Sequence, residues 1–171
     1  MGFPRYRAGG GCGIRGFTLV ELTVTLAILT VLTVIGVPGI MGLVRDSRLS
    51  TNTDMLINAL NSARIEAVKR RTDITVCPVA DPNGDSACVA DASLWSNGAI
   101  VLDGATVVQR IIFAQGVTVT SVATEVVING TLGSSTASVT FQLCATGRRQ
   151  QEVEIAMSGH VKKTLTATTC S

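Results

Sequence analysis

The sequence has 171 residues, of which 46% are apolar and 15% are charged, and its formal net charge is +2. Residues 1–16 contain three arginines and no acid, so the remainder holds 11 basic and 12 acidic residues, a net charge of −1. This length accommodates one domain plus a targeting segment. Because the chain beyond residue 16 is nearly neutral, it has no broad electrostatic attraction for nucleic acid.

Residues 1–16 are rich in glycine and arginine and show no apolar periodicity, which is typical of a processed leader. Gly11, Gly13 and Gly16 formally match the dinucleotide-binding spacing G-x-G-x-x-G. No strand precedes these glycines, so we do not interpret the match as a nucleotide site.

The next segment, residues 17–37, is apolar except for a single charge at Glu21. As a helix it would span about 32 Å, close to the hydrocarbon thickness of a bilayer. The arginines before it form a positive flank that stays cytoplasmic, so the rest of the chain should face outward. A carboxylate inside a membrane span costs about 2.5–3.5 kcal/mol and marks a functional position. Glu21 therefore requires a partner.

Pro38 follows this segment and is expected to bend or interrupt the helix, since proline removes a backbone hydrogen bond. Beyond it, apolar residues recur at helical spacing, which predicts a second helical stretch from about Ile40 to Arg71. The apolar stripe should pack on the chain's own domain. It comprises Met55, Leu56, Ala59, Leu60, Ala63 and Ala67.

After Arg71 the sequence becomes rich in β-branched residues, with Gly, Ser or Asn between short runs. These runs predict seven or eight antiparallel strands and a polar loop over residues 78–97, hence an α+β domain with no internal linker. The expected strands are Ile74–Cys77, Ala99–Leu102, Val107–Phe113, Val117–Val122, Glu125–Ile128, Ala137–Cys144, Glu152–Met157 and Val161–Ala167.

Five cysteines are present, and Cys12 lies in the leader. The other four form an even set in a segment expected outside the cytoplasm, which indicates two disulfides. Three pairings are open from the sequence. We favour Cys77 with Cys88, which closes a local loop, and Cys144 with Cys170, which fastens the C-terminus.

The segment Gly16-Phe17-Thr18-Leu19-Val20-Glu21-Leu22, followed by the apolar run and Pro38, resembles the class III signal of type IV pilins and type II secretion pseudopilins. Further similarity is to the GspH/FimT branch of minor pseudopilins and minor pilins. It is carried by residues 60–70, the Val76-Cys77-Pro78 run, Cys88, Trp95, Gly98, Asp103, Arg110, Ser158, Gly159 and Cys170.

The resemblance implies a type IV pilin-like fold with a leader (1–16), a membrane-spanning helix (17–39) and a periplasmic globular domain (40–171). It also implies that a prepilin peptidase cuts between Gly16 and Phe17 and methylates the new N-terminal nitrogen. Glu21 could then pair with the Phe17 amine of its own or a neighbouring subunit, since paired buried charges cost far less than one alone.

The implied function is structural: a single-pass inner-membrane protein and minor pseudopilin that joins other pseudopilins in a periplasmic filament of a type II secretion system. Its partners would be those subunits, the prepilin peptidase and the inner-membrane assembly platform. An ordinary signal peptide or signal anchor is the alternative, but a plain anchor leaves Glu21 unexplained. Residues 34–39 also lack the small-residue pattern that signal peptidase requires.

The residues that could carry chemistry do not indicate an enzyme, and we expect neither a cofactor nor a metal. The single histidine, His160, has no nucleophile or metal-ligand spacing around it. Asp81, Asn83 and Asp85 resemble half of a calcium loop. Ser86 replaces the glycine and Ala92 the glutamate that such a loop requires, so we interpret this segment as a polar turn.

A second functional hypothesis is a type IV minor pilin that acts in pilus biogenesis or binds DNA for uptake. Some members of this branch use a glycine-arginine-x-arginine motif, and the matching stretch here is Gly159-His160-Val161-Lys162, without either arginine. Lysine holds a phosphate as a point charge and lacks the bidentate fork of arginine. The candidate phosphate contacts are Arg148, Arg149, Lys162 and Lys163, and a solvated rim is the simpler interpretation.

Overall fold

The computed structural model of the protein describes residues 16–171, apart from the side chains of residues 35–39. The predicted leader, including Cys12 and its three arginines, therefore lies outside the described residues, except for Gly16. Two compact units meet at residue 40, and each is described by itself. The elements are α1 (Leu19–Arg70), β1 (Ile74–Pro78), a 3₁₀ turn η1 (Ala92–Ser96), β2 (Ala99–Asp103), β3 (Thr106–Ile111), β4 (Thr118–Ser121), β5 (Val126–Ile128), β6 (Val139–Cys144), β7 (Arg149–Ile155) and β8 (Val161–Thr169).

Helix α1 is assigned as one element of 52 residues that passes through residue 38. The helix therefore continues across the proline, and the bend expected there stays a prediction. Lys69 and Arg70 lie in its last turn, where cations interact favourably with the helix dipole. The helix ends before Arg71, whose positive φ of 57° is the left-handed conformation that follows many helices.

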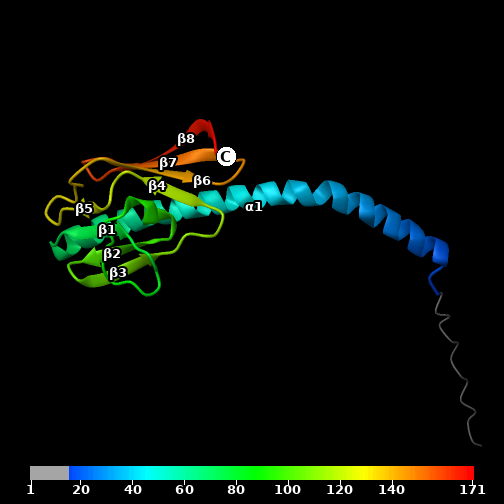
Figure 1. Ribbon diagram of the computed structural model, residues 1–171, viewed down its shortest axis with the longest axis horizontal. Helices are drawn as coiled ribbons and strands as arrows, with labels where there is room; N and C mark the ends of the chain where they lie inside the picture. Colours follow the sequence, from blue (N-terminus) through cyan, green and yellow to red (C-terminus); the bar gives the residue numbers. More distant parts are fainter. Residues whose placement is uncertain (1–15) are drawn as a thin grey trace, which may run out of the picture. The chain divides into compact units, whose positions relative to one another are not determined.

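The second unit, residues 41–171, contains two four-stranded antiparallel sheets with strand orders β3-β2-β1-β5 and β4-β6-β7-β8. The second half of α1 contacts both sheets, because Arg70 pairs with Asp103 on β2 and Asp54 pairs with Lys163 on β8. In Figure 1 this half of the helix runs between β6–β8 on one side and β1–β3 on the other. The prediction of a helix packed on antiparallel strands is confirmed.

One large apolar cluster joins α1 to both sheets. Trp95 and Phe141 belong to this cluster and pack in an edge-to-face arrangement, with ring centroids 4.8 Å apart. The Trp95 indole N–H donates to the Ala123 carbonyl at 2.7 Å, so the buried ring leaves no polar group unpaired. The predicted apolar stripe faces this cluster, with exposures of 1% or less for Leu56, Ala59, Leu60, Ala63 and Ala67 and partial burial of Met55.

All eight expected strands are present, with shifted ends. β7 begins at Arg149, three residues before the expected start, because β8 pairs with it as far as Thr169. β3 ends at Ile111, two residues before the expected end at Phe113. The loop expected over residues 78–97 also contains η1, which delivers Trp95 to the core. The ends of these strands are set by strand pairing and core contacts, which the local sequence pattern does not report.

Candidate functional site

Gly16, Phe17 and Thr18 directly precede α1, which begins at Leu19. Thr18 caps the helix: its hydroxyl oxygen accepts from the Glu21 backbone N–H at 3.2 Å, and its carbonyl accepts from Leu22 at 3.1 Å. Threonine at the cap with glutamate three residues later is the spacing of a capping box. We did not single out Thr18 in the sequence, although this spacing was visible there.

Glu21 lies in the first turn of α1, where the helix dipole favours a negative charge, and its side chain is exposed. Phe17, whose nitrogen would become the chain start after cleavage, is four residues away along the chain. The structure therefore brings Phe17, Thr18 and Glu21 to the same helix end. The pairing between the Glu21 carboxylate and an amine stays a prediction.

The first part of α1, from Leu19 to Val34, exposes apolar side chains on every side. The exposed fractions include 78% for Leu19, 55% for Ile28 and 75% for Val34. A helix that is apolar all round belongs inside a larger assembly or a membrane. In the part of the chain that the structure describes, no helix meets the length and apolarity needed for a membrane crossing.

The polar residues of this segment are satisfied internally. The hydroxyls of Thr23, Thr25, Thr30 and Thr33 each donate to a backbone carbonyl three or four residues earlier, at 2.7–3.1 Å. Such back-bonding is how threonine fits a helix in apolar surroundings. Glu21 is therefore the one side chain between Leu19 and Val34 that brings a charge into the segment.

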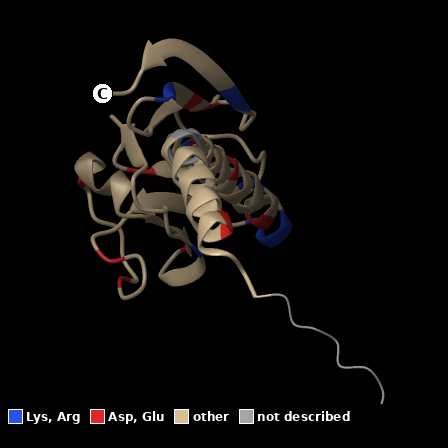
Figure 2. Cartoon of the chain, turned by 90° about the vertical axis from the view of Figure 1, so that its right-hand side faces the viewer, with Lys and Arg blue, Asp and Glu red and all other residues tan. Residues whose placement is uncertain are grey.

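The four candidate DNA contacts do not form a common patch. Arg148 pairs with Asp46 of α1 at 2.9 Å, and Lys163 pairs with Asp54 of α1 at 2.8 Å. Lys162 lies directly across from Glu154 in the β7–β8 ladder. Figure 2 shows basic and acidic segments interspersed along the chain. Acids thus pair with two of these four cations, Arg148 and Lys163, while Lys162 and Arg149 are exposed.

The half-match to a calcium loop is a turn held by its own carboxylates. The Asp85 side chain accepts from the Asp81 N–H at 2.8 Å, and the Asp81 side chain accepts from the Asn83 N–H at 2.9 Å. Arg110 donates to the Pro82 and Asp85 carbonyls at 2.7 and 2.6 Å and fastens the loop to β3. Among the described residues, no group of three potential metal ligands comes together.

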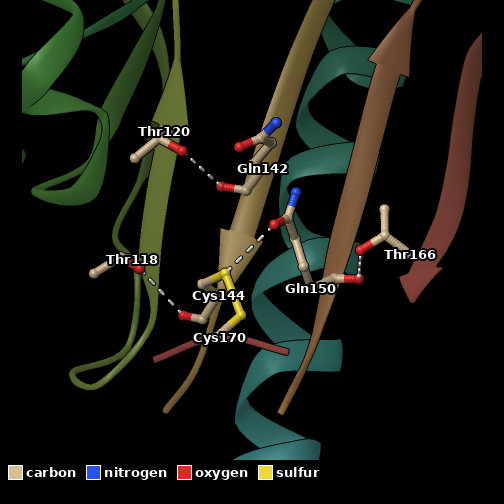
Figure 3. Close-up of a disulfide and its surroundings, with 7 residues drawn as sticks. All are labelled: Thr118, Thr120, Gln142, Cys144, Gln150, Thr166 and Cys170. Atoms are coloured by element: carbon tan, nitrogen blue, oxygen red, sulfur yellow. Dashed lines mark hydrogen bonds between the residues drawn. A yellow bond between two sulfur atoms is a disulfide. The ribbon is translucent and has the colours of Figure 1, made fainter. Parts of the chain in front are cut away.

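Both favoured cysteine pairs are disulfides in the structure, Cys77 with Cys88 and Cys144 with Cys170. Figure 3 shows the second, which joins the end of β6 to the chain beyond β8. Backbone bonds support the same closure, because Cys170 donates to Arg148 at 2.8 Å and its carbonyl accepts from Gly147 at 3.0 Å. The bridge therefore fastens the C-terminus to the sheet.

Two further residues of the family-like pattern have structural roles. Gly159 forms the β7–β8 turn with φ 75°, and an added Cβ would collide with the Gly133 carbonyl. The Gly159 carbonyl also accepts from Arg64 of α1 at 3.2 Å. The second residue, Asp103, forms an ion pair with Arg70 at 3.1 Å. Arg70 also donates a hydrogen bond to Glu66, which holds the pKa of the Glu66 carboxyl below its ordinary value. His160 is exposed on this turn.

Two family models match the chain. The model described as type II transport protein GspH matches residues 52–159, and the model of the prokaryotic N-terminal methylation motif matches residues 13–37. No curated protein matches. Two crystal structures of the type IV minor pilin FimU from Pseudomonas aeruginosa share the fold. They are 18% and 17% identical, cover 72% of this chain and 96% and 98% of their own, and give TM-scores of 0.54 and 0.51.

Proposed function

We propose, from the premise that this chain belongs to the GspH family of pilin-like proteins, that it is a minor pseudopilin of a type II secretion system. Members of the family are structural subunits rather than enzymes. The matching model describes a type II transport protein, which supports a place in the secretion filament. The subunit would enter a periplasmic filament through the first half of α1 and take part in the export of folded proteins.

The observation that carries this proposal is the exposed apolar half of α1 with Glu21 in its first turn. Its threonine hydroxyls are bonded internally, so the segment can be surrounded by apolar material without unpaired hydroxyls. In the membrane, lipid would cover it, and in the filament the equivalent helices of neighbouring subunits would. The N-terminal motif over residues 13–37 supports anchoring by this helix.

Cleavage between Gly16 and Phe17 would create the amine that Glu21 needs. An added Cβ at Gly16 meets no atom within 4 Å, so packing does not explain the glycine. Recognition by a prepilin peptidase would explain it, and the same enzyme would methylate the Phe17 nitrogen. We propose that Glu21 pairs with this nitrogen in the filament, since an unpaired buried charge costs several kcal/mol.

The proposed division of the chain follows from the same route. Residues 1–16 would be removed, residues 17–39 would lie in the inner membrane with the N-terminus cytoplasmic, and residues 40–171 would be periplasmic. The two disulfides support the last assignment, because such bonds persist in oxidising compartments. The bend at Pro38 would separate the membrane helix from the globular domain.

The DNA-uptake alternative has less support from the charges. Arg148 and Lys163 each pair with an acid of α1, so strong phosphate binding by these two side chains would require breaking those pairs. A DNA-binding surface normally gathers unpaired cations on one face.

Deletion of the gene, with complementation by the intact chain, tests the proposal. We expect export of folded substrates to stop while surface pili remain. The expected partners in a crosslinking map are other pseudopilins and the assembly platform. Loss of pili with normal export would contradict the secretion assignment and favour the type IV minor pilin. Salt-sensitive binding of DNA by the full chain would favour the uptake function.

A further inference from the structure

Three asparagine–glycine pairs occur in the chain, at residues 83–84, 97–98 and 129–130. In such a pair the glycine backbone nitrogen can attack the asparagine side-chain amide, because glycine has no Cβ to obstruct the approach. The attack requires a free asparagine side chain, an available glycine nitrogen and a backbone that can open. The three pairs differ in how far the fold meets these requirements.

The pair at residues 129–130 is fixed by hydrogen bonds to both reacting groups. The Asn129 side-chain oxygen accepts from the backbone N–H groups of Thr131 at 2.8 Å and Leu132 at 3.3 Å. The Gly130 N–H donates to the Asp73 carboxylate at 2.9 Å, and Gly130 is buried. Attack at Asn129 would require all three bonds to break.

The pair at residues 97–98 is held directly before β2. The Asn97 side-chain amide donates to the Ala80 carbonyl at 3.3 Å, and its backbone N–H donates to Leu94 at 2.9 Å. Gly98 is buried, and its carbonyl accepts from the Val79 N–H at 3.3 Å. The backbone of this pair therefore cannot open without disturbing the strand entry.

The pair at residues 83–84 lies in the loop between β1 and η1, and both residues are exposed. Among the residues that the structure describes, neither the Asn83 side chain nor the Gly84 N–H has a hydrogen-bond partner. The turn is held by its neighbours: the Asp81 carboxylate accepts from the Asn83 N–H at 2.9 Å, and the Asp81 carbonyl accepts from the Asp85 N–H at 2.9 Å. Both reacting groups are therefore available when this turn opens.

We propose that Asn83 is a site of spontaneous deamidation and that the fold protects Asn97 and Asn129. A solvent base takes the proton of the Gly84 N–H, and the nitrogen bonds to Cγ of Asn83. The bond from Cγ to the amide nitrogen breaks, and that nitrogen leaves as ammonia. Water then opens the five-membered succinimide ring at either carbonyl, which gives aspartate or isoaspartate at position 83. The net reaction consumes water and releases ammonia.

The product adds a carboxylate between those of Asp81 and Asp85. Residues 41–171 contain 11 basic and 11 acidic side chains, so their net charge changes from zero to −1. Isoaspartate also lengthens the backbone by one carbon, which breaks the turn between residues 81 and 85. The disulfide from Cys77 to Cys88 still closes the loop, so the rest of the fold should be unaffected. The reaction does not depend on the proposed secretion role.

Incubation of the full chain in detergent tests the proposal. Peptide mass spectrometry follows conversion at the three asparagines in the same sample, and isoaspartyl methyltransferase measures isoaspartate. We expect Asn83 to convert at least about tenfold faster than Asn97 or Asn129, since each hydrogen bond that must break first lowers the open population by about two- to tenfold. The rate should rise with pH, because a base must remove the Gly84 proton.

Two variants test the dependence on the turn. Arg110 donates to the Pro82 and Asp85 carbonyls, so Arg110→Gln should loosen the loop and raise the rate at Asn83 while leaving Asn129 unchanged. Arg45→Gln removes an equal charge from an exposed position on α1 and should change neither rate. Asn83→Gln should abolish the fast conversion, because its longer side chain would need a larger ring.

The unfolded chain is the reference for these rates. In denaturant the three asparagines should convert at similar rates, which would show that the fold causes the difference. Equal rates in the folded chain would overturn the proposal. So would an intact Asn83 under conditions in which the unfolded chain converts. A preference for Asn83 that persisted unchanged in denaturant would mean that local sequence, not the fold, selects the site.

Discussion

The two halves of α1 differ in what covers their apolar side chains. In the first half Leu19 is 78% exposed and Leu32 is 65% exposed, whereas in the second half Leu56 and Leu60 are fully buried. The first half is apolar on all sides, and the second is amphipathic with one buried stripe. We therefore expect partners outside the chain to cover the first half, whereas the second half packs on the two sheets.

This difference predicts a separation of effects. Changes in the first half should alter processing, membrane contact or assembly and leave the unfolding of residues 41–171 unchanged. Changes in the second half should alter that unfolding. Helix length does not cause this difference between the halves, because each half is long enough to form a regular helix.

The largest effect is expected at the cleavage position. Gly16→Leu places a bulky side chain where the peptidase would need a small one, so processing should be blocked almost completely. Since packing does not require glycine here, the unfolding of residues 41–171 should stay unchanged. The mass of the accumulated protein measures cleavage. Normal maturation of Gly16→Leu would contradict the assignment of the site.

In the second half, Leu60→Ala should destabilise the domain by about 2–5 kcal/mol, because it opens a cavity among fully buried neighbours. Val31→Ala is the matched control in the first half, where Val31 is 59% exposed, and should change stability little. Denaturant unfolding measures both. Equal destabilisation by the two variants would show that the first half also packs on the domain.

Removal of the second disulfide should cost about 3.5 kcal/mol, as expected for a bridge that closes a loop of 26 residues. The double change Cys144→Ser and Cys170→Ser should therefore lower the unfolding midpoint. The double change Cys77→Ser and Cys88→Ser, which opens a loop of 11 residues, should cost slightly less. If only the shorter bridge proved stabilising, the C-terminus would not depend on Cys170 for its attachment.

The smallest effect is expected at the surface ion pair between Lys163 and Asp54, which joins β8 to α1 at 2.8 Å. Lys163→Ala should cost less than about 1 kcal/mol, since solvent screens such pairs. High salt should remove the difference from the unchanged protein. A cost that is larger and insensitive to salt would mean that Lys163 contributes mainly by packing its stem.

The sequence patterns predicted the helix, the eight strands and the buried stripe well, because apolar spacing reports directly on which face is covered. Strand ends were less predictable. β7 includes Arg149 and Gln150, which have no apolar pattern of their own, and they are in the strand because Thr169 pairs with Arg149. The local sequence pattern also did not predict the 3₁₀ turn that buries Trp95.

For the candidate site, Gly16 and Glu21 could be identified because one acid interrupts a long apolar run. Thr18 could have been identified from its spacing to Glu21. The charge pairs that neutralise Arg148 and Lys163 could not, since their partners on α1 lie 102 and 109 residues away. Such pairs depend on which side of a strand faces the helix, which is known only once the sheet is placed.

Incorporation of Glu21 variants into filaments tests most directly whether the first half of α1 assembles through charge pairing. Glu21→Gln keeps the size and removes the charge, whereas Glu21→Asp keeps the charge. All variants should be cleaved and should unfold normally. We expect Glu21→Gln to be largely absent from filaments and Glu21→Asp to be partly retained. Entry of Glu21→Gln at the level of the unchanged protein would contradict the pairing with the Phe17 amine.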